Sequence, residues 1–210
     1  MKLGWALLLC VASLTAANVP PPAVDLPAPA AGKVATAVLA GGNFWGMEAV
    51  FERLKGVIAV IPGYAGGKAE DAQESKVMAG KTKHAESVQI TYDPSQISYG
   101  KLLQCFFAVA HDPTQIDRQG PDAGPQYRSV IFYSTDGQKQ VAQAYIRQIE
   151  RAHVFHDSIA TQVSLLPGFF PAEDHNQHYM KRNPNDPYVV QNVLPKIKAL
   201  EQQFPDLLKP

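Results

Sequence analysis

Strand-like and helix-like stretches alternate through most of the chain, beginning at Val34. Short runs that are apolar or alternate in polarity predict strands, whereas apolar residues three or four positions apart predict helices. Strands are predicted at 34–40, 57–61, 87–93, 129–134 and 161–166, and helices at 44–55, 99–109, 136–153, 172–181 and 190–203. Because such elements bury their apolar faces against one another, we expect one compact layered domain.

The balance of apolar and charged residues limits the class of protein. The chain has 210 residues, of which 46% are hydrophobic, and this suits one well-packed domain rather than two. Its 19 Lys and Arg residues equal its 19 Asp and Glu residues, so no overall basic field attracts phosphate backbones. We therefore expect no nucleic acid among its partners.

The N-terminus, residues 1–17, has the layout of a secretory signal peptide. One lysine precedes an apolar run at 5–14, and small residues lead to a predicted cleavage site after Ala17. The run is too short to span a bilayer, so we expect a secreted or periplasmic protein with no membrane association after cleavage. An alternative is that Cys10 is lipidated, but Leu9 stands where a small residue is expected.

The stretch after the leader, residues 18–33, is rich in Pro and Ala and has no helical or alternating pattern. We therefore predict a flexible, partly polyproline-like spacer ahead of a domain at 34–210. Cleavage would remove Cys10 and leave Cys105, so no intramolecular disulfide is possible, which suits an oxidising compartment. Cys105 lies on the apolar face of a predicted helix and is interpreted as buried packing.

The string GGNFWG at 41–46 joins a predicted strand to a predicted helix and places Asn43 at or near the helix N-cap. Free N–H groups and the helix dipole favour a negative charge there, so a cysteine at this position would be a reactive thiolate. Asparagine is neutral and hardly nucleophilic, but it is among the best N-cap residues. Taken alone, Asn43 is interpreted as a structural cap.

Five strings carry a family resemblance. They are GGNFWGMEAVFERLKGV, GYAGG, GKTKHAESVQITYDPSQISYGKLL, FFAVAHDPTQIDRQGPDAGPQYRSVIFY and FFPAEDHNQHY. Together they resemble the peptide methionine sulfoxide reductase A family, nearly continuously from 38 to 204. The resemblance implies an α+β fold, a two-layer α/β sandwich with a ferredoxin-like mixed sheet and a long irregular C-terminal segment, to which the proline-rich stretch 168–188 belongs.

The resemblance also implies a reaction. In that family a cysteine between the turn glycines and FW attacks the sulfur of a methionine S-sulfoxide, the substrate oxygen is protonated and lost, and a sulfenic acid forms on the enzyme. External thiols, finally those of thioredoxin, restore the cysteine, and no cofactor is bound. The family thereby repairs oxidised methionine in proteins. The nucleophile's position is held by Asn43 in this chain.

Further residues match the family's substrate site. Phe44 and Trp45 match an apolar pocket for the substrate methyl group. Glu86 matches the acid that protonates the sulfoxide oxygen, Tyr127 matches a hydroxyl donor to that oxygen, and Asp122 matches a nearby carboxylate. A sulfoxide is polar at oxygen and apolar at its methyl group, so aromatic walls beside donors suit it. An acid beside aromatic rings would be desolvated and stay protonated closer to neutrality.

The same residues also have plain structural interpretations, and several positions depart from the family pattern. Taken singly, Phe44 and Trp45 would be core packing. Glu74 stands where members commonly have a second tyrosine donor, and an ionised carboxylate accepts rather than donates. Asp117 and Asn176 stand where Asn and His are expected. The C-terminal tail has no resolving cysteine, as in members that rely directly on external thiols.

Two histidine pairs could in principle bind a metal. His153 with His156, and His175 with His178, have a spacing that could direct both imidazoles to one side of a helix. Neither pair belongs to a known ligand motif, so surface histidines are expected and no metal site is predicted.

Three functions are therefore compared. The first is a methionine S-sulfoxide reductase, inactive or strongly impaired because residue 43 is asparagine. The second is a pseudoenzyme that binds methionine sulfoxide or Met-rich peptides without reducing them. The third is a histidine-based metal binder.

Overall fold

The computed structural model describes residues 17–27 and 32–210. The predicted leader lies outside the described residues apart from Ala17, and so does Cys10. Export of the protein therefore stays a prediction. In the described part of the chain, no helix is both long enough and apolar enough to cross a membrane.

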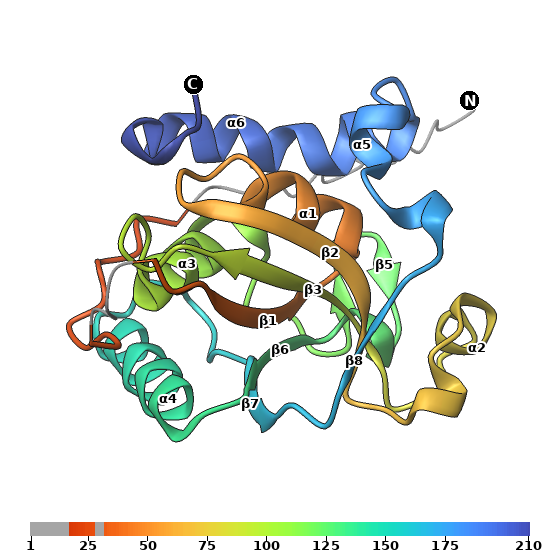
Figure 1. Ribbon diagram of the computed structural model, residues 1–210, viewed down its shortest axis with the longest axis horizontal. Coiled ribbons are helices and arrows are strands. Elements are labelled where there is room, and N and C mark those ends of the chain that lie inside the picture. The colour runs from red at the N-terminus through yellow and green to blue at the C-terminus, as the bar shows by residue number, and fades with distance from the viewer. Residues whose placement is uncertain (1–16, 28–31) are drawn as a thin grey trace, which may run out of the picture.

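One six-stranded mixed sheet organises the domain, with the strand order β7-β6-β1-β3-β2-β8 (Figure 1). Neighbouring strands are antiparallel except for the parallel pair β6 and β7. The strands are β1 (Ala35–Gly41), β2 (Val57–Ala65), β3 (Ala85–Tyr92), β6 (Ser129–Tyr133), β7 (Gln162–Leu165) and β8 (Phe169–Pro171). Because β1 lies between β3 and β6, the turn after β1 begins in the middle of the sheet.

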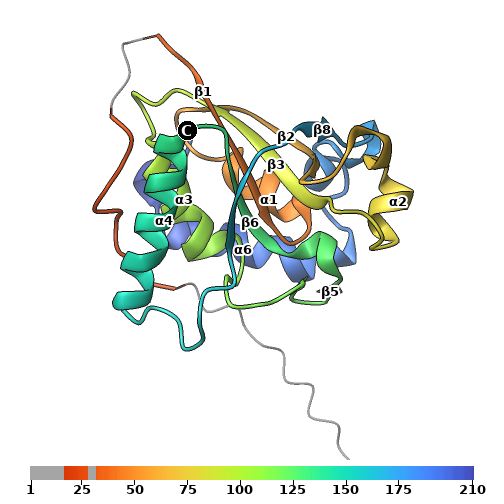
Figure 2. The same cartoon turned by 90° about the horizontal axis from the view of Figure 1, so that it is seen from below.

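The helices pack on this sheet and on one another. They are α1 (Phe44–Phe51), α2 (Glu74–Met78), α3 (Tyr99–Cys105), α4 (Asp136–Arg151), α5 (Tyr179–Arg182) and α6 (Leu194–Gln203). Helix α1 contacts β1, β2 and β3, α4 contacts β6 and β7, and α6 lies along α1 (Figures 1 and 2). A short ribbon of β4 (Arg118–Gln119) and β5 (Asp122–Ala123) stands apart from the sheet.

Alternate side chains of the strands point to opposite faces of the sheet. Ala37 and Leu39 of β1 belong to the main core, to which α1, α3, α4 and α6 also contribute. Val38 and Ala40 belong to a smaller apolar cluster with residues of β3 and β6. The two clusters confirm the predicted α+β class and the two-layer arrangement.

Two predictions for the C-terminal part need refinement. The covering segment contains an edge strand, β8, that pairs with β2. Gly63 permits this pairing, because a Cβ atom there would lie 2.4 Å from both the Phe169 ring and the Phe170 carbonyl oxygen. The helix predicted at 172–181 is wrong as one element. His178 has a φ of 53°, so its backbone separates a 3-10 turn (Asp174–Asn176) from α5.

The described part of the predicted spacer is not flexible, so this prediction is wrong for residues 18–27. Val19 is only 3% exposed and belongs to the main core. The Tyr145 hydroxyl of α4 donates to the Pro20 carbonyl oxygen at 2.7 Å, and Gln104 Nε2 of α3 donates to the Val19 carbonyl oxygen at 2.8 Å. A segment without helix or strand is thus held by side chains of two distant helices.

We predict that Val19→Ala lowers the free energy of unfolding by about 1–3 kcal/mol, because it removes two buried methyl groups and leaves a cavity. Val24→Ala is the matched control, since Val24 lies in the same segment and is 52% exposed. Its effect should stay within about 0.5 kcal/mol. Urea denaturation of both variants measures the difference, and equal effects would contradict docking of this segment.

Candidate functional site

The turn between β1 and α1 forms the centre of the candidate site. Asn43 is the N-cap of α1, and its Oδ1 atom accepts a hydrogen bond from the Trp45 backbone N–H at 2.9 Å. Gly42 has a φ of 89°, and a Cβ atom there would lie 2.5 Å from Gln119 Cγ, so this position requires glycine. The interpretation of Asn43 as a helix cap is confirmed, and its amide is held against the backbone.

Glu86 of β3 is buried directly behind this turn. It is 3% exposed, and its Oε2 atom accepts a hydrogen bond from the Phe44 backbone N–H at 3.0 Å. Burial raises the pKa of Glu86 to about 8; the charges of Asp122 and Glu74 add to the rise, and the Phe44 hydrogen bond opposes it. Glu86 is therefore mostly protonated at neutral pH, as expected for an acid beside aromatic rings.

Aromatic rings surround the first turn of α1. Phe44 is buried, with its ring centroid 5.9 Å from that of Tyr64 on β2. Trp45 is half-buried and stacks on Tyr179 of α5, with centroids 3.6 Å apart and planes 6° apart. Tyr188 meets the Trp45 ring edge-on at 5.7 Å. Trp45 thus packs against the main core, and two C-terminal tyrosines hold its indole from two sides.

Tyr127 lies in a 3-10 turn (Pro125–Tyr127) after the β4–β5 ribbon. Its hydroxyl donates to the sulfur of Met78, with the oxygen and sulfur 3.4 Å apart. Burial raises the pKa of Tyr127, and the charges of Glu86 and Asp122 raise it further, so the hydroxyl stays protonated. The Tyr127 hydroxyl is therefore already bound to a thioether, that of Met78 in the same chain.

Asp122 of β5 accepts a hydrogen bond from the Tyr188 hydroxyl at 2.5 Å. Burial raises the pKa of Asp122, while this hydrogen bond and the nearby Lys196 charge lower it. Burial lowers the pKa of Lys196 to about 8, and Asp122 opposes that change. A Cβ atom on Gly46 would lie 3.3 Å from the Lys196 Nζ atom, so this amine reaches the first turn of α1.

Glu74, at the start of α2, is connected to Trp45 by two hydrogen bonds through Asn176. The Trp45 Nε1–H donates to Asn176 Oδ1 at 3.0 Å, and Asn176 Nδ2 donates to Glu74 Oε1 at 3.0 Å. The other Glu74 oxygen lies 3.0 Å from His175 Nε2. The structure therefore brings Glu74 to the rim of the site as an acceptor for its own neighbours. Asp117, in contrast, lies in the loop before β4, with a φ of 49°.

Cys105 is fully buried in the main core, and burial raises the pKa of its thiol to about 12. The interpretation of Cys105 as packing is confirmed. A thiol that is neither exposed nor ionised cannot act as a nucleophile for a peptide substrate.

The two histidines of each predicted pair do not direct their imidazoles to a common site. His175 bonds Glu74, whereas His178 bonds Glu52. His156 lies on the surface beside Asp157, and His153 has a φ of 48° in the turn after α4.

Sequence reasoning missed several residues of the site. Tyr64, Met78, Tyr179, Tyr188 and Lys196 contact or approach the predicted residues only because distant segments meet. No local pattern distinguishes them from ordinary packing or surface residues.

Comparison with known proteins decides the family. The chain matches the family described as Peptide methionine sulfoxide reductase over residues 35–208. It is 54% identical over 173 residues to Peptide methionine sulfoxide reductase MsrA 2 of Synechocystis sp., an alignment that covers 82% of this chain and 81% of that protein. The chain belongs to the peptide methionine sulfoxide reductase family.

Other peptide methionine sulfoxide reductases show the same likeness. The MsrA 2 protein of Mesorhizobium japonicum is 51% identical over 172 residues, covering 82% of this chain and 88% of that protein. Methionine sulfoxide reductase A of Corynebacterium diphtheriae has a TM-score of 0.62 at 32% identity, covering 80% and 83% of the two chains. Reduced Mxr1 from Saccharomyces cerevisiae has a TM-score of 0.65 at 30% identity, covering 74% and 88%.

The raised pKa of Glu86 makes stability depend on pH. Its pKa rises from 4.5 to about 8 on folding, so the stability due to this proton is complete below about pH 4.5 and is lost as the pH rises toward 8. The side chain of Glu86→Gln stays neutral at every pH. We therefore predict that its free energy of unfolding, relative to that of the unaltered protein, increases by a few kcal/mol between about pH 5 and pH 8.

Urea denaturation at both pH values measures this gain. Glu150→Gln, at an exposed glutamate of α4, is the control and should show no such pH-dependent gain. An offset between Glu86→Gln and the unaltered protein that is the same at both pH values would contradict the prediction.

Proposed function

We propose that this member of the peptide methionine sulfoxide reductase family binds methionine S-sulfoxide in peptides or proteins, and that its reductase turnover is strongly impaired. The observation that carries the proposal is the place of Asn43. A neutral amide, bonded to the backbone of α1, holds the position that the resemblance gives to the nucleophilic cysteine. The nitrogen lone pair of an amide is delocalised into its carbonyl group, so it cannot attack sulfur as a thiolate does.

Binding is supported by the groups around that position. Under this proposal the protonated carboxyl of Glu86 and the hydroxyl of Tyr127 donate to the sulfoxide oxygen. A thioether is a weak acceptor, so a sulfoxide oxygen can replace Met78 as the partner of Tyr127. The substrate methyl group would lie against Phe44 and Trp45, whose rings are already fixed by neighbouring aromatics.

The missing chemical step can be stated as a balance of atoms. A thiolate at residue 43 would attack the sulfoxide sulfur, and the net step would convert the thiolate, the sulfoxide and one proton into a sulfenic acid and methionine. An external thiol such as dithiothreitol, or a thioredoxin in the cell, would then reduce the sulfenic acid, and no bound cofactor would be needed. Asn43 offers no sulfur for the first step, and Cys105 is too deeply buried to supply it.

We predict that Asn43→Cys gains thiol-dependent reduction of a peptide containing methionine S-sulfoxide. The helix N-terminus lowers the pKa of a thiol at this position, and under this proposal Glu86 and Tyr127 donate to the sulfoxide oxygen. By analogy with a hydrolase that has lost its nucleophile, the unaltered protein should be slower by a factor on the order of a million. Product formation with dithiothreitol, followed by mass spectrometry, measures both rates.

Asn43→Ser is the matched control for this gain. Serine keeps an N-cap oxygen but brings no thiol, so it should remain as slow as the unaltered protein. If the unaltered protein turned over within about tenfold of Asn43→Cys, the proposed impairment would be wrong.

We further predict that the unaltered protein binds the oxidised peptide and that Tyr127→Phe weakens binding about 5- to 30-fold, because one hydrogen bond to the oxygen is lost. Trp45→Ala should abolish the signal, since it removes the wall for the methyl group. Tyr133→Phe, on β6, is the control and should bind as the unaltered protein does. Isothermal calorimetry gives the affinities, and absence of heat with the unaltered protein would exclude the binding function.

A further inference from the structure

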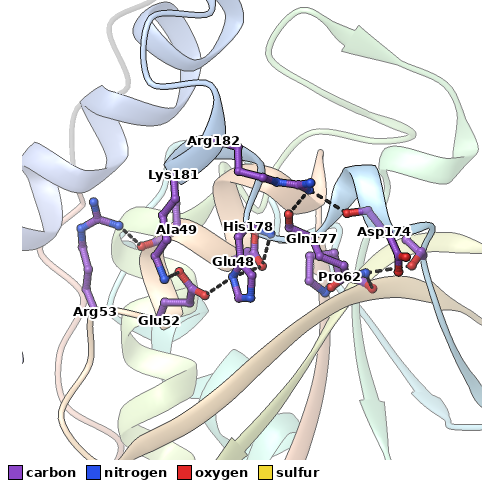
Figure 3. A network of polar contacts seen from close by, with 11 residues as sticks. Glu48, Ala49, Glu52, Arg53, Pro62, Asp174, Gln177, His178, Lys181 and Arg182 are labelled. Atoms are coloured by element: carbon purple, nitrogen blue, oxygen red, sulfur yellow. Dashed lines mark hydrogen bonds and ion pairs between the residues drawn. The ribbon is translucent and has the colours of Figure 1, made fainter.

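A second cluster of polar side chains lies further along α1. Glu48 and Glu52 are one helical turn apart, and His178 reaches them from the residue before α5 (Figure 3). His178 Nδ1 lies 2.7 Å from Glu52 Oε1 and 3.2 Å from Glu48 Oε1. One ligand atom from each of the three residues lies within 4.8 Å of the other two.

We propose that Glu48, Glu52 and His178 form a binding site for a divalent transition-metal ion of the Zn²⁺ type. One imidazole nitrogen and two carboxylate oxygens are a donor set that suits zinc and its neighbours better than Mg²⁺ or Ca²⁺, which prefer oxygen alone. Bonds of about 2.0–2.2 Å to a tetrahedral ion place ligand atoms roughly 3.3–3.6 Å apart. The observed separations of 2.7 and 3.2 Å therefore need only a small outward rotation of the side chains.

The charge balance at Glu48 supports a cation here. Its side chain is only 2% exposed, so it can be ionised only beside a positive partner or a metal. Among the described residues, the only ion-pair partner of Glu48 is His178. Lys181 is bound to Glu52 Oε2, at 2.9 Å, whereas Glu52 Oε1 contacts His178 Nδ1, at 2.7 Å, and an ion would take the place of this second contact (Figure 3).

The backbone fixes the imidazole over the two carboxylates. His178 has a φ of 53°, in the left-handed region that few non-glycine residues adopt, and its N–H donates to Glu48 Oε1 at 2.9 Å. Gln177 anchors the loop by donating from Nε2 to the carbonyl oxygens of Pro62 and Ala172, at 3.0 and 2.9 Å. Arg182 holds the other side of the loop through the Asp174 carbonyl oxygen, at 2.7 Å.

The cluster also has room for further ligands. A groove of about 490 Å³ along β2 is lined by Glu52, Gln177, His178 and Lys181. Because Glu52 and His178 line this groove, an ion bound to them and to Glu48 would keep a coordination position open to water. His178 does not pair with His175 in the structure; it converges instead with Glu48 of α1 and with Glu52, the C-cap residue of that helix.

Equilibrium dialysis of the full chain without a histidine tag, stripped with a chelator and then exposed to ZnCl₂, tests this site. One Zn²⁺ per chain is expected. Glu52→Gln and His178→Gln should each lower the affinity at least tenfold, because each removes one of three ligands. Loading with Co²⁺ should give the intense visible absorption of a tetrahedral site, and His178→Gln should remove it.

Two further variants separate a metal site from a simple ion-pair cluster. His175→Gln is the matched control, since His175 is three residues away and bonds Glu74, and it should retain Zn²⁺. Lys181→Met should raise the affinity, because it removes the cation that competes for Glu52. The proposal is overturned if no Zn²⁺ is retained, or if His178→Gln and His175→Gln retain it equally. None of these results depends on methionine sulfoxide binding.

Discussion

The hydrogen bond from the Phe44 N–H to the carboxyl group of Glu86 connects the central strand β3 to the first turn of α1. It satisfies a backbone donor at a helix start, where no intrahelical partner exists, and it orients an acid that burial keeps protonated. The turn glycines, the cap at Asn43 and the aromatic pair after it all depend on this approach of helix to strand. The same helix continues to Glu48 and Glu52, so its position also sets the proposed metal site.

Two of the residues that depart from the family resemblance, Glu74 and Asn176, are neighbours in space. Trp45, Asn176, Glu74 and His175 form one chain of hydrogen bonds, and Asn43 caps the helix on which Trp45 lies. An amide at residue 176 can accept from the indole and donate to a carboxylate at the same time. The substitutions at 74 and 176 are therefore compatible with each other. They keep the indole fixed, which a binding site requires, while residue 43 provides no nucleophile.

The sequence patterns predicted most of the core elements because these are local. The strands at β1, β3, β6 and β7 alternate or are continuously apolar, and Ser98 caps α3 by accepting from the Lys101 N–H. The patterns missed β8 and the docking of residues 17–27. Both segments are held by hydrogen bonds to partners elsewhere in the chain, which leave no local sequence pattern. The predicted spacer shows this most clearly, since its proline-rich composition gives no sign that Val19 is buried.

The sequence by itself determined the family, the central sheet and the absence of a thiol at residue 43, because these depend on residue identity and on short-range periodicity. Only the tertiary structure decided which groups meet: Tyr179 and Tyr188 around Trp45, Met78 on Tyr127, and His178 with two glutamates of α1. Side chains far apart in the chain become neighbours through sheet pairing and helix packing. The spacing of His175 and His178 therefore could not reveal that the two imidazoles bind different carboxylates.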